Sequence, residues 1–210
     1  MSPEEVQDIL NVSRETFDVL QHYVRVLRTW QKSLNLVSAH SLAHVWRRHI
    51  VDCAQLYAHI PPDAHTLADM GSGAGLPGLI LAILSRSRPN FHITLIESNS
   101  KKCGFLRYAA ADLGLDVTIL RARLQTARPA PVDVLTARAL APLNTLLFLA
   151  QPYRHSAQSR QTTRCLFLKG QDVEQELTAT AKCWKLESTL FPSLSDPSGA
   201  LLVIEDFHPC

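Results

Sequence analysis

The sequence predicts an α/β fold: a Rossmann-like, doubly wound, mostly parallel sheet of seven strands with a helical N-terminal extension. From residue 65 onward, short apolar segments rich in branched side chains alternate with segments of helical periodicity. That order is typical of parallel sheets covered by helices on both faces. A glycine-rich turn, GSGAGLPG at residues 71–78, follows the first of these strands. In such sheets ligands bind beyond the carboxyl ends of the strands, which is where this turn is expected.

The first 60 residues are expected to form helices that precede the sheet. Residues 13–34 repeat apolar side chains at helical spacing. A second helix is expected over residues 40–58, where a Pro-Pro pair follows and ends it. We therefore divide the chain into a helical extension over residues 1–60 and a ligand-binding domain over residues 61–210, which together form one structural unit.

Strands and helices are expected to alternate through the rest of the chain. The expected strands cover residues 65–70, 91–97, 116–120, 132–138, 163–170, 184–191 and 200–207. The last two could form a closing antiparallel pair. Helices are expected over residues 78–87, 98–115, 142–154 and 172–183. The helix over residues 98–115 is expected to begin at a serine cap and to stop at Gly114. The polar stretch 155–164 is expected to be a loop.

The composition is that of an ordinary globular protein, with 46% hydrophobic and 19% charged residues among 210. No apolar run approaches the roughly 18 residues of a membrane span, and the N-terminus lacks a signal-peptide pattern, so we expect a cytoplasmic protein with no membrane partner. Five cysteines without a C-x-x-C pair predict reduced thiols and no metal site. A net charge of +2 neither establishes nor excludes a nucleic-acid partner.

The residues at the glycine turn favour one kind of ligand. Gly71, Gly73 and Gly75 let the backbone approach a ligand closely. Glu97 ends the next expected strand and is placed to accept ribose hydroxyls. Asp69 stands two residues before the first glycine, and its carboxylate would repel a pyrophosphate and attract a cation. S-adenosylmethionine fits, because it carries an ammonium and a sulfonium and no phosphate. The alternative role for Asp69 is to cap local backbone N–H groups, and both roles can hold together.

Other classes stay open at this point. A nicotinamide-dependent oxidoreductase could use the same sheet, but Leu76 stands where the G-x-G-x-x-G pattern needs its third glycine. Asp69 also opposes a pyrophosphate. A binding module without a cofactor could share the fold, because fold alone does not define function. A strand-to-helix turn that binds nothing is the remaining alternative.

Seven short motifs spread over residues 34–170 resemble those of a known family. They are LNLVS (34–38), RRHIVD (47–52), DMGSGAGLPG (69–78), LIESNSKK (95–102), RAR (121–123), TARALAPL (136–143) and LKG (168–170). This combination resembles the class I S-adenosylmethionine-dependent methyltransferases. Within that class it resembles the bacterial 16S ribosomal RNA guanine-N7 methyltransferases, also called glucose-inhibited division protein B. The resemblance implies methyl transfer from S-adenosylmethionine to N7 of a guanine in 16S ribosomal RNA of the small subunit. We expect a monomer, and another RNA or small-molecule methyltransferase is the alternative.

The resemblance also implies roles for individual residues. Those that would contact the cofactor are Gly71, Leu76, Glu97, Leu124, Gln125 and Arg138. Leu124 and Gln125 would lie beside the adenine, and Arg138 would reach the methionine end or the substrate. The family usually has Glu where this chain has Gln125. This difference puts one polar contact near the adenine in question.

Guanine N7 carries an in-plane lone pair and no proton, so its methylation needs no general base. We therefore predict no catalytic acid or base and expect the protein to position its substrates. Candidates for contact with RNA are Arg47, Arg48, His49, Arg121, Arg123 and Lys169. A solvated surface charge is the alternative for each cation, and a buried, hydrogen-bonded ring is the alternative for His49. Asp52 is expected to fix helix packing or loops, with a substrate role as the alternative.

Overall fold

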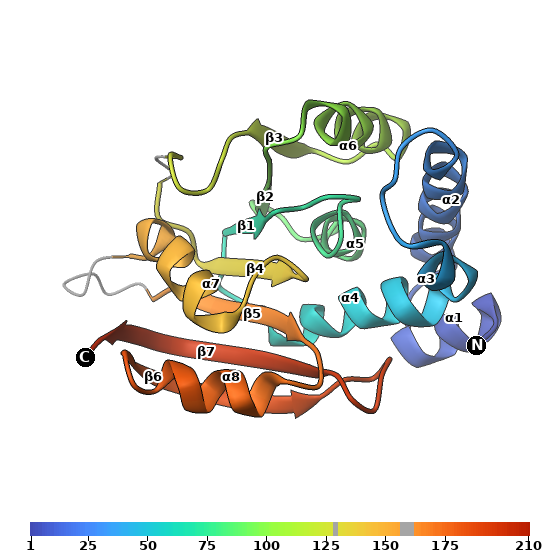
Figure 1. Ribbon diagram of the computed structural model, residues 1–210. Coiled ribbons are helices and arrows are strands. Elements are labelled where there is room, and N and C mark those ends of the chain that lie inside the picture. The colour runs from blue at the N-terminus through green and yellow to red at the C-terminus, as the bar shows by residue number, and fades with distance from the viewer. Residues whose placement is uncertain (128–129, 156–161) are drawn as a thin grey trace.

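The computed structural model describes residues 1–127, 130–155 and 162–210. It contains the predicted α/β fold around a seven-stranded sheet of strand order β3-β2-β1-β4-β5-β7-β6 (Figure 1). The strands are β1 (Thr66–Met70), β2 (His92–Glu97), β3 (Val117–Arg121), β4 (Val134–Arg138), β5 (Arg164–Lys169), β6 (Trp184–Pro192) and β7 (Ala200–Pro209). Strands β1 to β5 run parallel, whereas β7 runs antiparallel to both β5 and β6. Residues 156–161 of the predicted polar loop lie outside the described residues.

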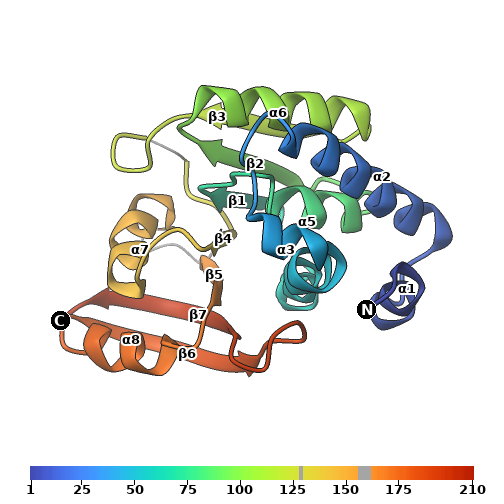
Figure 2. The same ribbon diagram turned by 45° about the vertical axis from the view of Figure 1, so that its right-hand side comes forward.

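Helices cover both faces of the sheet (Figure 2). They are α1 (Pro3–Leu10), α2 (Arg14–Gln31), α3 (Ala39–Ala43), α4 (Asp52–Ala54), α5 (Gly78–Leu84), α6 (Ser100–Asp112), α7 (Leu143–Ala150) and α8 (Val173–Thr180). Because strand side chains alternate, Leu67 of β1 packs in the cluster that contains α2, α5 and α6, whereas Ala68 and Met70 pack in the cluster that contains α7. Among the described residues, no helix is long and apolar enough to cross a membrane.

The prediction of a single helix over residues 40–58 is wrong. After α3 the chain forms a π-helical segment (Trp46–Val51), then α4, then a 3-10 helix (Gln55–His59). Arg138 donates from Nη2 to the carbonyl oxygen of Arg48 at 2.7 Å. A side chain that enters a helical hydrogen-bond ladder is a known cause of such irregularity, and π turns are frequent at functional sites.

The helix predicted over residues 98–115 is present as α6, but its cap differs. Its N-cap is Asn99 and not a serine, and the Asn99 Oδ1 accepts hydrogen bonds from the backbone N–H groups of Lys101 and Lys102. The predicted stop at Gly114 is confirmed, because this residue has a φ of +62° that favours glycine.

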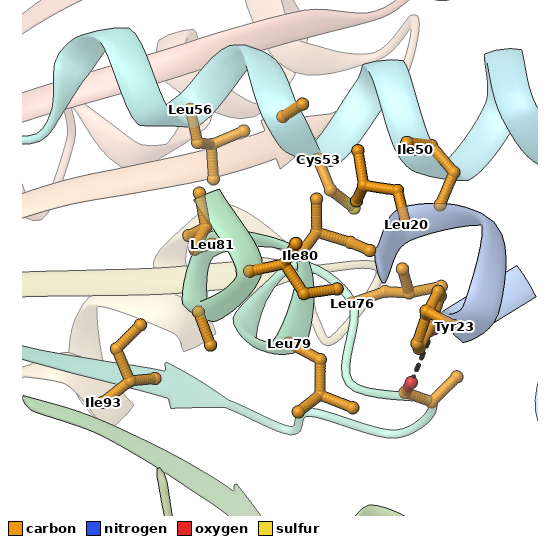
Figure 3. Packing of buried hydrophobic residues seen from close by; sticks show 14 of the residues in the cluster. Leu20, Tyr23, Ile50, Cys53, Leu56, Leu76, Leu79, Ile80, Leu81 and Ile93 are labelled. Carbon is orange, nitrogen blue, oxygen red and sulfur yellow. Dashed lines mark hydrogen bonds between the residues drawn. The ribbon is translucent and has the colours of Figure 1, made fainter. Parts of the chain in front are cut away.

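The N-terminal helices share a core with the glycine turn and α5 (Figure 3). Leu20 from α2 and Cys53 from α4 belong to the same buried cluster as Ile80 of α5. The hydroxyl of Tyr23 donates to the carbonyl oxygen of Ala74 at 2.8 Å, so α2 is tied directly to the glycine turn. The predicted division at residue 60 thus separates two segments of one packed core, and it stays a prediction.

Candidate functional site

The candidate site lies at the carboxyl ends of β1, β2 and β4. Met70, near the end of β1, stands in register with Ile96 of β2 on one side and Ala137 of β4 on the other. The strand order reverses between β1 and β4, and a crevice at that point is where open α/β sheets bind ligands. Gly71, which follows β1, and Glu97 and Arg138, the last residues of β2 and β4, therefore come to one edge of the sheet.

The glycine turn is built from left-handed backbone. Gly71, Gly73 and Gly75 have φ values of +71°, +55° and +79°, a region that side-chain-bearing residues rarely adopt. At Gly75 a Cβ atom would lie 2.4 Å from Leu79 Cδ1, so this glycine is required for packing. At Gly73 a Cβ atom would meet no atom closer than 3.8 Å, so open space lies beside this glycine. That space is available to a ligand.

Asp69 lies behind the turn and is fully buried. Its Oδ2 accepts a hydrogen bond from the Gly78 backbone N–H at 3.1 Å, and its Oδ1 accepts one from Thr136 Oγ1 at 2.9 Å. Burial raises the pKa of this carboxyl to about 6. The hydrogen bond from Gly78 is the one expected if Asp69 caps local backbone N–H groups. The attraction of Asp69 for a bound cation would act through space and stays a prediction.

Glu97 joins three elements at the site. Its Oε2 accepts a hydrogen bond from the Gly73 N–H at 3.1 Å, and its Oε1 accepts one from the Asn99 N–H at 2.7 Å. The residue is 9% exposed. Because a carboxylate oxygen can accept two hydrogen bonds, each oxygen keeps capacity for a ribose hydroxyl. That contact stays a prediction.

A cavity of about 330 Å³ opens between the glycine turn and the N-terminal segment. Gly71, Gly73 and Leu76 line it from the turn, and His49 and Arg138 line it from the opposite side. We call it the turn cavity. With Arg48, it brings together six of the sequence-predicted site residues, and its open space at Gly73 gives a ligand room against the backbone.

Two predicted adenine contacts lie elsewhere. Leu124 and Gln125 are in a turn that follows β3, and they are not among the described residues that line the turn cavity. Leu124 is buried in the cluster that contains α7, whereas Gln125 is exposed. The turn cavity therefore does not include the predicted adenine contacts.

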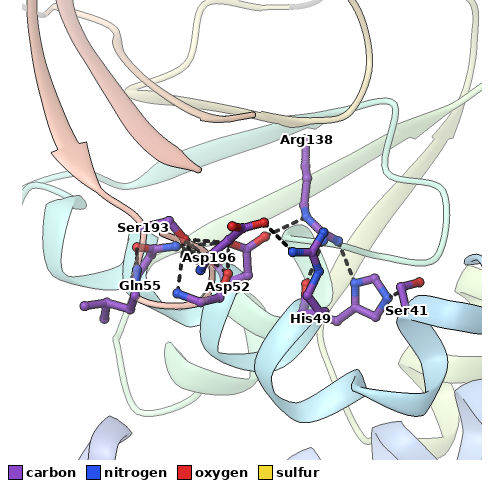
Figure 4. A network of polar contacts seen from close by, with 10 residues as sticks. Ser41, His49, Asp52, Gln55, Arg138, Ser193 and Asp196 are labelled. Atoms are coloured by element: carbon purple, nitrogen blue, oxygen red, sulfur yellow. Dashed lines mark hydrogen bonds and ion pairs between the residues drawn. The ribbon is translucent and has the colours of Figure 1, made fainter. Parts of the chain in front are cut away.

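Arg138 is the centre of a polar network (Figure 4). Its Nε donates to Asp52 Oδ2 at 2.9 Å, and its Nη1 lies 2.9 Å from His49 Nδ1. A guanidinium can only donate, so Nδ1 must be the acceptor and Nε2 must carry the proton of this ring. The Nε2 atom lies 3.0 Å from Ser41 Oγ, to which it donates.

His49 is buried and hydrogen-bonded, which was the alternative to RNA contact for this ring. Its exposed fraction is 5%, and both ring nitrogens have partners. Burial lowers its pKa to about 3, and the charge of Arg138 acts in the same direction. The ring is therefore neutral near pH 7.

The loop between β6 and β7 is held by the segment that carries His49. Asp52 Oδ1 accepts a hydrogen bond from Ser195 Oγ at 2.7 Å, and Arg47 Nε donates to the Ser195 carbonyl oxygen at 2.6 Å. Arg48 forms an ion pair with Asp196. Asp52 thus fixes a loop, as predicted. Arg47 and Arg48 have protein partners in addition to any contact with RNA.

The remaining residues predicted to contact RNA differ in the exposure of their side chains and in their protein partners. Lys169 Nζ lies 2.6 Å from Glu176 Oε2 and donates to the Ala141 carbonyl oxygen at 3.2 Å, and its side chain is only 7% exposed. Arg121 and Arg123 are exposed at and just after the end of β3. Arg47 and Arg48 are exposed as well, so Lys169 is the one buried cation among those predicted to contact RNA. Among the described residues, no cluster of His, Cys, Asp or Glu could hold a metal ion.

The sheet order, the glycine turn and the acidic residue at the end of β2 define a class I S-adenosylmethionine-dependent methyltransferase fold. A methyltransferase from Geobacter sulfurreducens aligns with a TM-score of 0.57 at 13% identity, covering 90% of this chain and 88% of that one. Magnesium protoporphyrin IX methyltransferase from Synechocystis PCC 6803 aligns with a TM-score of 0.55 at 13% identity, covering 88% of this chain and 97% of that one. At these identities the likeness shows the fold.

The family follows from the sequence comparisons. A family model described as rRNA small subunit methyltransferase G matches residues 16–197. The proteins of that name from Parvibaculum lavamentivorans and Paramagnetospirillum magneticum are each 44% identical to this chain. Both alignments cover 98% of this chain, with 89% of the first relative and 96% of the second. The chain belongs to the rRNA small subunit methyltransferase G family.

Proposed function

We propose that this protein transfers a methyl group from S-adenosylmethionine to N7 of a guanine in the 16S ribosomal RNA of the small subunit. The observation that carries the proposal is the turn cavity, where the backbone at Gly73 leaves open space beside Arg138. The ribosomal RNA target is supported by the name that the relatives carry. The choice of guanine N7 is supported by the motifs quoted above. We also propose a monomeric enzyme in the cytoplasm.

The residues at the turn fit S-adenosylmethionine. Gly71, Gly73 and Leu76 would lie against it, and Glu97 would accept hydrogen bonds from the ribose hydroxyls. Leu124 and Gln125 would flank the adenine, with Gln125 offering an amide where the family usually has a carboxylate. When bound, S-adenosylmethionine supplies a methyl group activated by its attachment to a sulfonium.

The chain's own contribution to the reaction is positioning. The N7 atom needs no deprotonation, so the protein has only to bring this atom and the methyl carbon into line. His49 lines the turn cavity, but both of its ring nitrogens are hydrogen-bonded and its low pKa keeps it neutral. This arrangement supports a mechanism without a general base. A pH–rate profile that reports an essential base with a pKa near neutrality would contradict it.

RNA binding is proposed for the basic edge around the site. Arg121 and Arg123 would contact phosphates, because they are exposed at the carboxyl edge of the sheet. Arg47 and Arg48 would act partly through the β6–β7 loop that they hold. Lys169 could reach RNA only if its ion pair with Glu176 opened.

The decisive experiment is methylation of small-subunit RNA with a radiolabelled methyl donor. Naked 16S RNA and assembled small subunits are assayed in parallel, and the modified nucleotide is mapped and identified by mass spectrometry. The proposal expects one 7-methylguanine. Label on another atom or base would instead identify a different RNA methyltransferase. A thermal shift with NAD and none with S-adenosylmethionine would favour an oxidoreductase, because stabilisation follows the ratio of ligand concentration to Kd.

A further inference from the structure

A second cavity adjoins the turn cavity on the far side of Arg138. Its volume is about 200 Å³, and it shares Arg48, Arg138 and Ala139 with the turn cavity. Gly170, just after β5, lines another part of it, and Ser195 of the β6–β7 loop lines the facing part. Arg138 therefore stands in the wall between two cavities at the carboxyl edge of the sheet.

The size of this second cavity limits what can occupy it. Pockets for drug-sized ligands run to roughly 300–1,000 Å³, and a cavity of about 200 Å³ is smaller than these. It suits one flat ring system and not a whole nucleotide. A polynucleotide would have to insert a single unstacked base, which is how enzymes commonly reach a base that they modify.

The polar atoms of this cavity match the donors of one base. Asp52 and Asp196 both line it. The Oδ2 atom of Asp52 accepts one hydrogen bond, from Arg138, and the Oδ2 atom of Asp196 accepts one, from Arg48. Each of these oxygens can accept one more. Guanine presents two donors on its Watson–Crick edge, the N1–H and the 2-amino group, whereas its N7 and O6 on the other edge are acceptors.

We propose that the second cavity binds the target guanine, with its Watson–Crick edge toward Asp52 and Asp196 and its N7 toward the wall shared with the turn cavity. This assignment rests on the proposed function. In the step itself, the N7 lone pair forms the bond to the methyl carbon, and the electron pair of the breaking carbon–sulfur bond stays on sulfur. The positive charge passes from the sulfonium to the guanine ring, and no proton moves. Two neighbouring carboxylates stabilise the ring that becomes charged.

Asp52 acts here as a positioning residue as well. One of its oxygens holds Arg138 and the other holds Ser195, so this side chain connects the wall between the cavities to the loop that closes the second one. Gln55 adds a contact from the same helical segment, because its Oε1 accepts a hydrogen bond from the Leu194 N–H at 3.1 Å.

Gly170 allows a steric test of this cavity. A Cβ atom at Gly170 would meet no atom within 4 Å, and its φ lies outside the left-handed region, so a side chain is tolerated there. We expect Gly170→Leu to lower kcat for RNA methylation at least a hundredfold and Gly170→Ala to lower it less. The Kd for S-adenosylmethionine, from calorimetry, and the Kd for 16S RNA, from filter binding, should change less than threefold. The matched control is Gly104→Leu, at an exposed helical glycine with equally open surroundings, which should leave all three values unchanged.

A substrate variant tests the same assignment without any change to the protein. Inosine keeps N7 and O6 but lacks the 2-amino group. With inosine at the mapped target position, we expect kcat/KM to fall about tenfold or more, whereas inosine at a neighbouring guanine should have no effect. The assignment is overturned if Gly170→Leu methylates RNA at the wild-type rate, if cofactor or RNA binding is lost in parallel with methylation, or if inosine is methylated as well as guanine. Failure of the proposed function would look different, since wild-type protein would then give no 7-methylguanine on unmodified RNA.

Discussion

Glu97 holds the glycine turn with the same carboxylate that is proposed to bind the ribose. We expect Glu97→Ala to weaken binding of S-adenosylmethionine by about 1–3 kcal/mol, because a charged hydrogen-bond acceptor is lost. Isothermal titration calorimetry measures this directly. The matched control is Glu187→Ala, at an exposed position of β6 far along the sheet order, which should leave affinity unchanged. Equal affinities for wild type and Glu97→Ala would remove this residue from the ribose.

Asp69 gives the protein a pH dependence of a defined sign. Burial raises its pKa from 3.8 to about 6, so the folded state holds this proton more tightly than the unfolded state. The resulting stabilisation is complete below the unfolded pKa and is lost as the pH rises through about 6. The free energy of unfolding of wild type minus that of Asp69→Asn should therefore fall by about 2 kcal/mol between about pH 4.5 and pH 7.5.

Urea unfolding of wild type and Asp69→Asn at intervals from pH 4.5 to 7.5 measures this difference. Asn can keep both local contacts, since its amide oxygen can accept from Gly78 and its NH₂ can donate to Thr136. The comparison thus isolates the titration from the loss of hydrogen bonds. A difference that stays constant, or that rises with pH, would show that the Asp69 carboxyl is not destabilised by its burial.

At the scale of elements, α2 supports the ligand-binding turn through one buried hydrogen bond. Tyr23→Phe removes the donor to the Ala74 carbonyl and keeps the ring, so we expect a loss of about 1–2 kcal/mol in the free energy of unfolding. Affinity for S-adenosylmethionine should fall as well, because the turn loses an external contact. Tyr108→Phe is the control, since this tyrosine is half exposed. If Tyr23→Phe lowered stability but not affinity, α2 would be packing the core without supporting the turn.

Most elements could be predicted because their signals are local. The glycine turn and the β-branched strands each depend on a few consecutive residues. The irregular segment over residues 39–59 could not be predicted, because Arg138 interrupts it from a strand 90 positions away from Arg48. The serine cap expected for α6 failed for a different reason. Asn99 stands between two serines, and residue preference alone does not separate these neighbours.

At the scale of the molecule, burial divides the five cysteines into two groups. Cys183, just before β6, and Cys210, just after β7, are exposed at the same end of this antiparallel pair, whereas Cys53, Cys103 and Cys165 are buried. We expect a thiol reagent to label two cysteines rapidly in the native protein and all five in denaturant. The double variant Cys183→Ser, Cys210→Ser should show no rapid phase. Rapid labelling of a third thiol would contradict the burial of the core cysteines.

The candidate site was only partly predictable from the chain. Motifs located the turn, Glu97 and Arg138 because each lies at or just after the end of a strand that reaches the same edge. The partners of Arg138 were missed, since Asp52 lies 86 positions away and nothing in the local sequence pairs them. Ser195 joins the same network from 143 positions beyond Asp52. Only the folded sheet brings such segments together. The ion pair that buries Lys169 could not be predicted either, because its partner Glu176 is contributed by α8.

The hydrogen bonds that Arg138 donates determine where this chain can be divided in a chimera. All three of its nitrogens are directed at residues 48, 49 and 52, which precede the sheet. A chimera that grafts only residues 61–210 onto another scaffold would carry this guanidinium without its counter-ion, and an unpaired charge at a partly buried position is strongly destabilising. We expect the smallest transplantable unit to include the segment from Ser41 to Gln55, so recombination between homologues should be tolerated best at crossovers that keep this segment and β4 from the same parent.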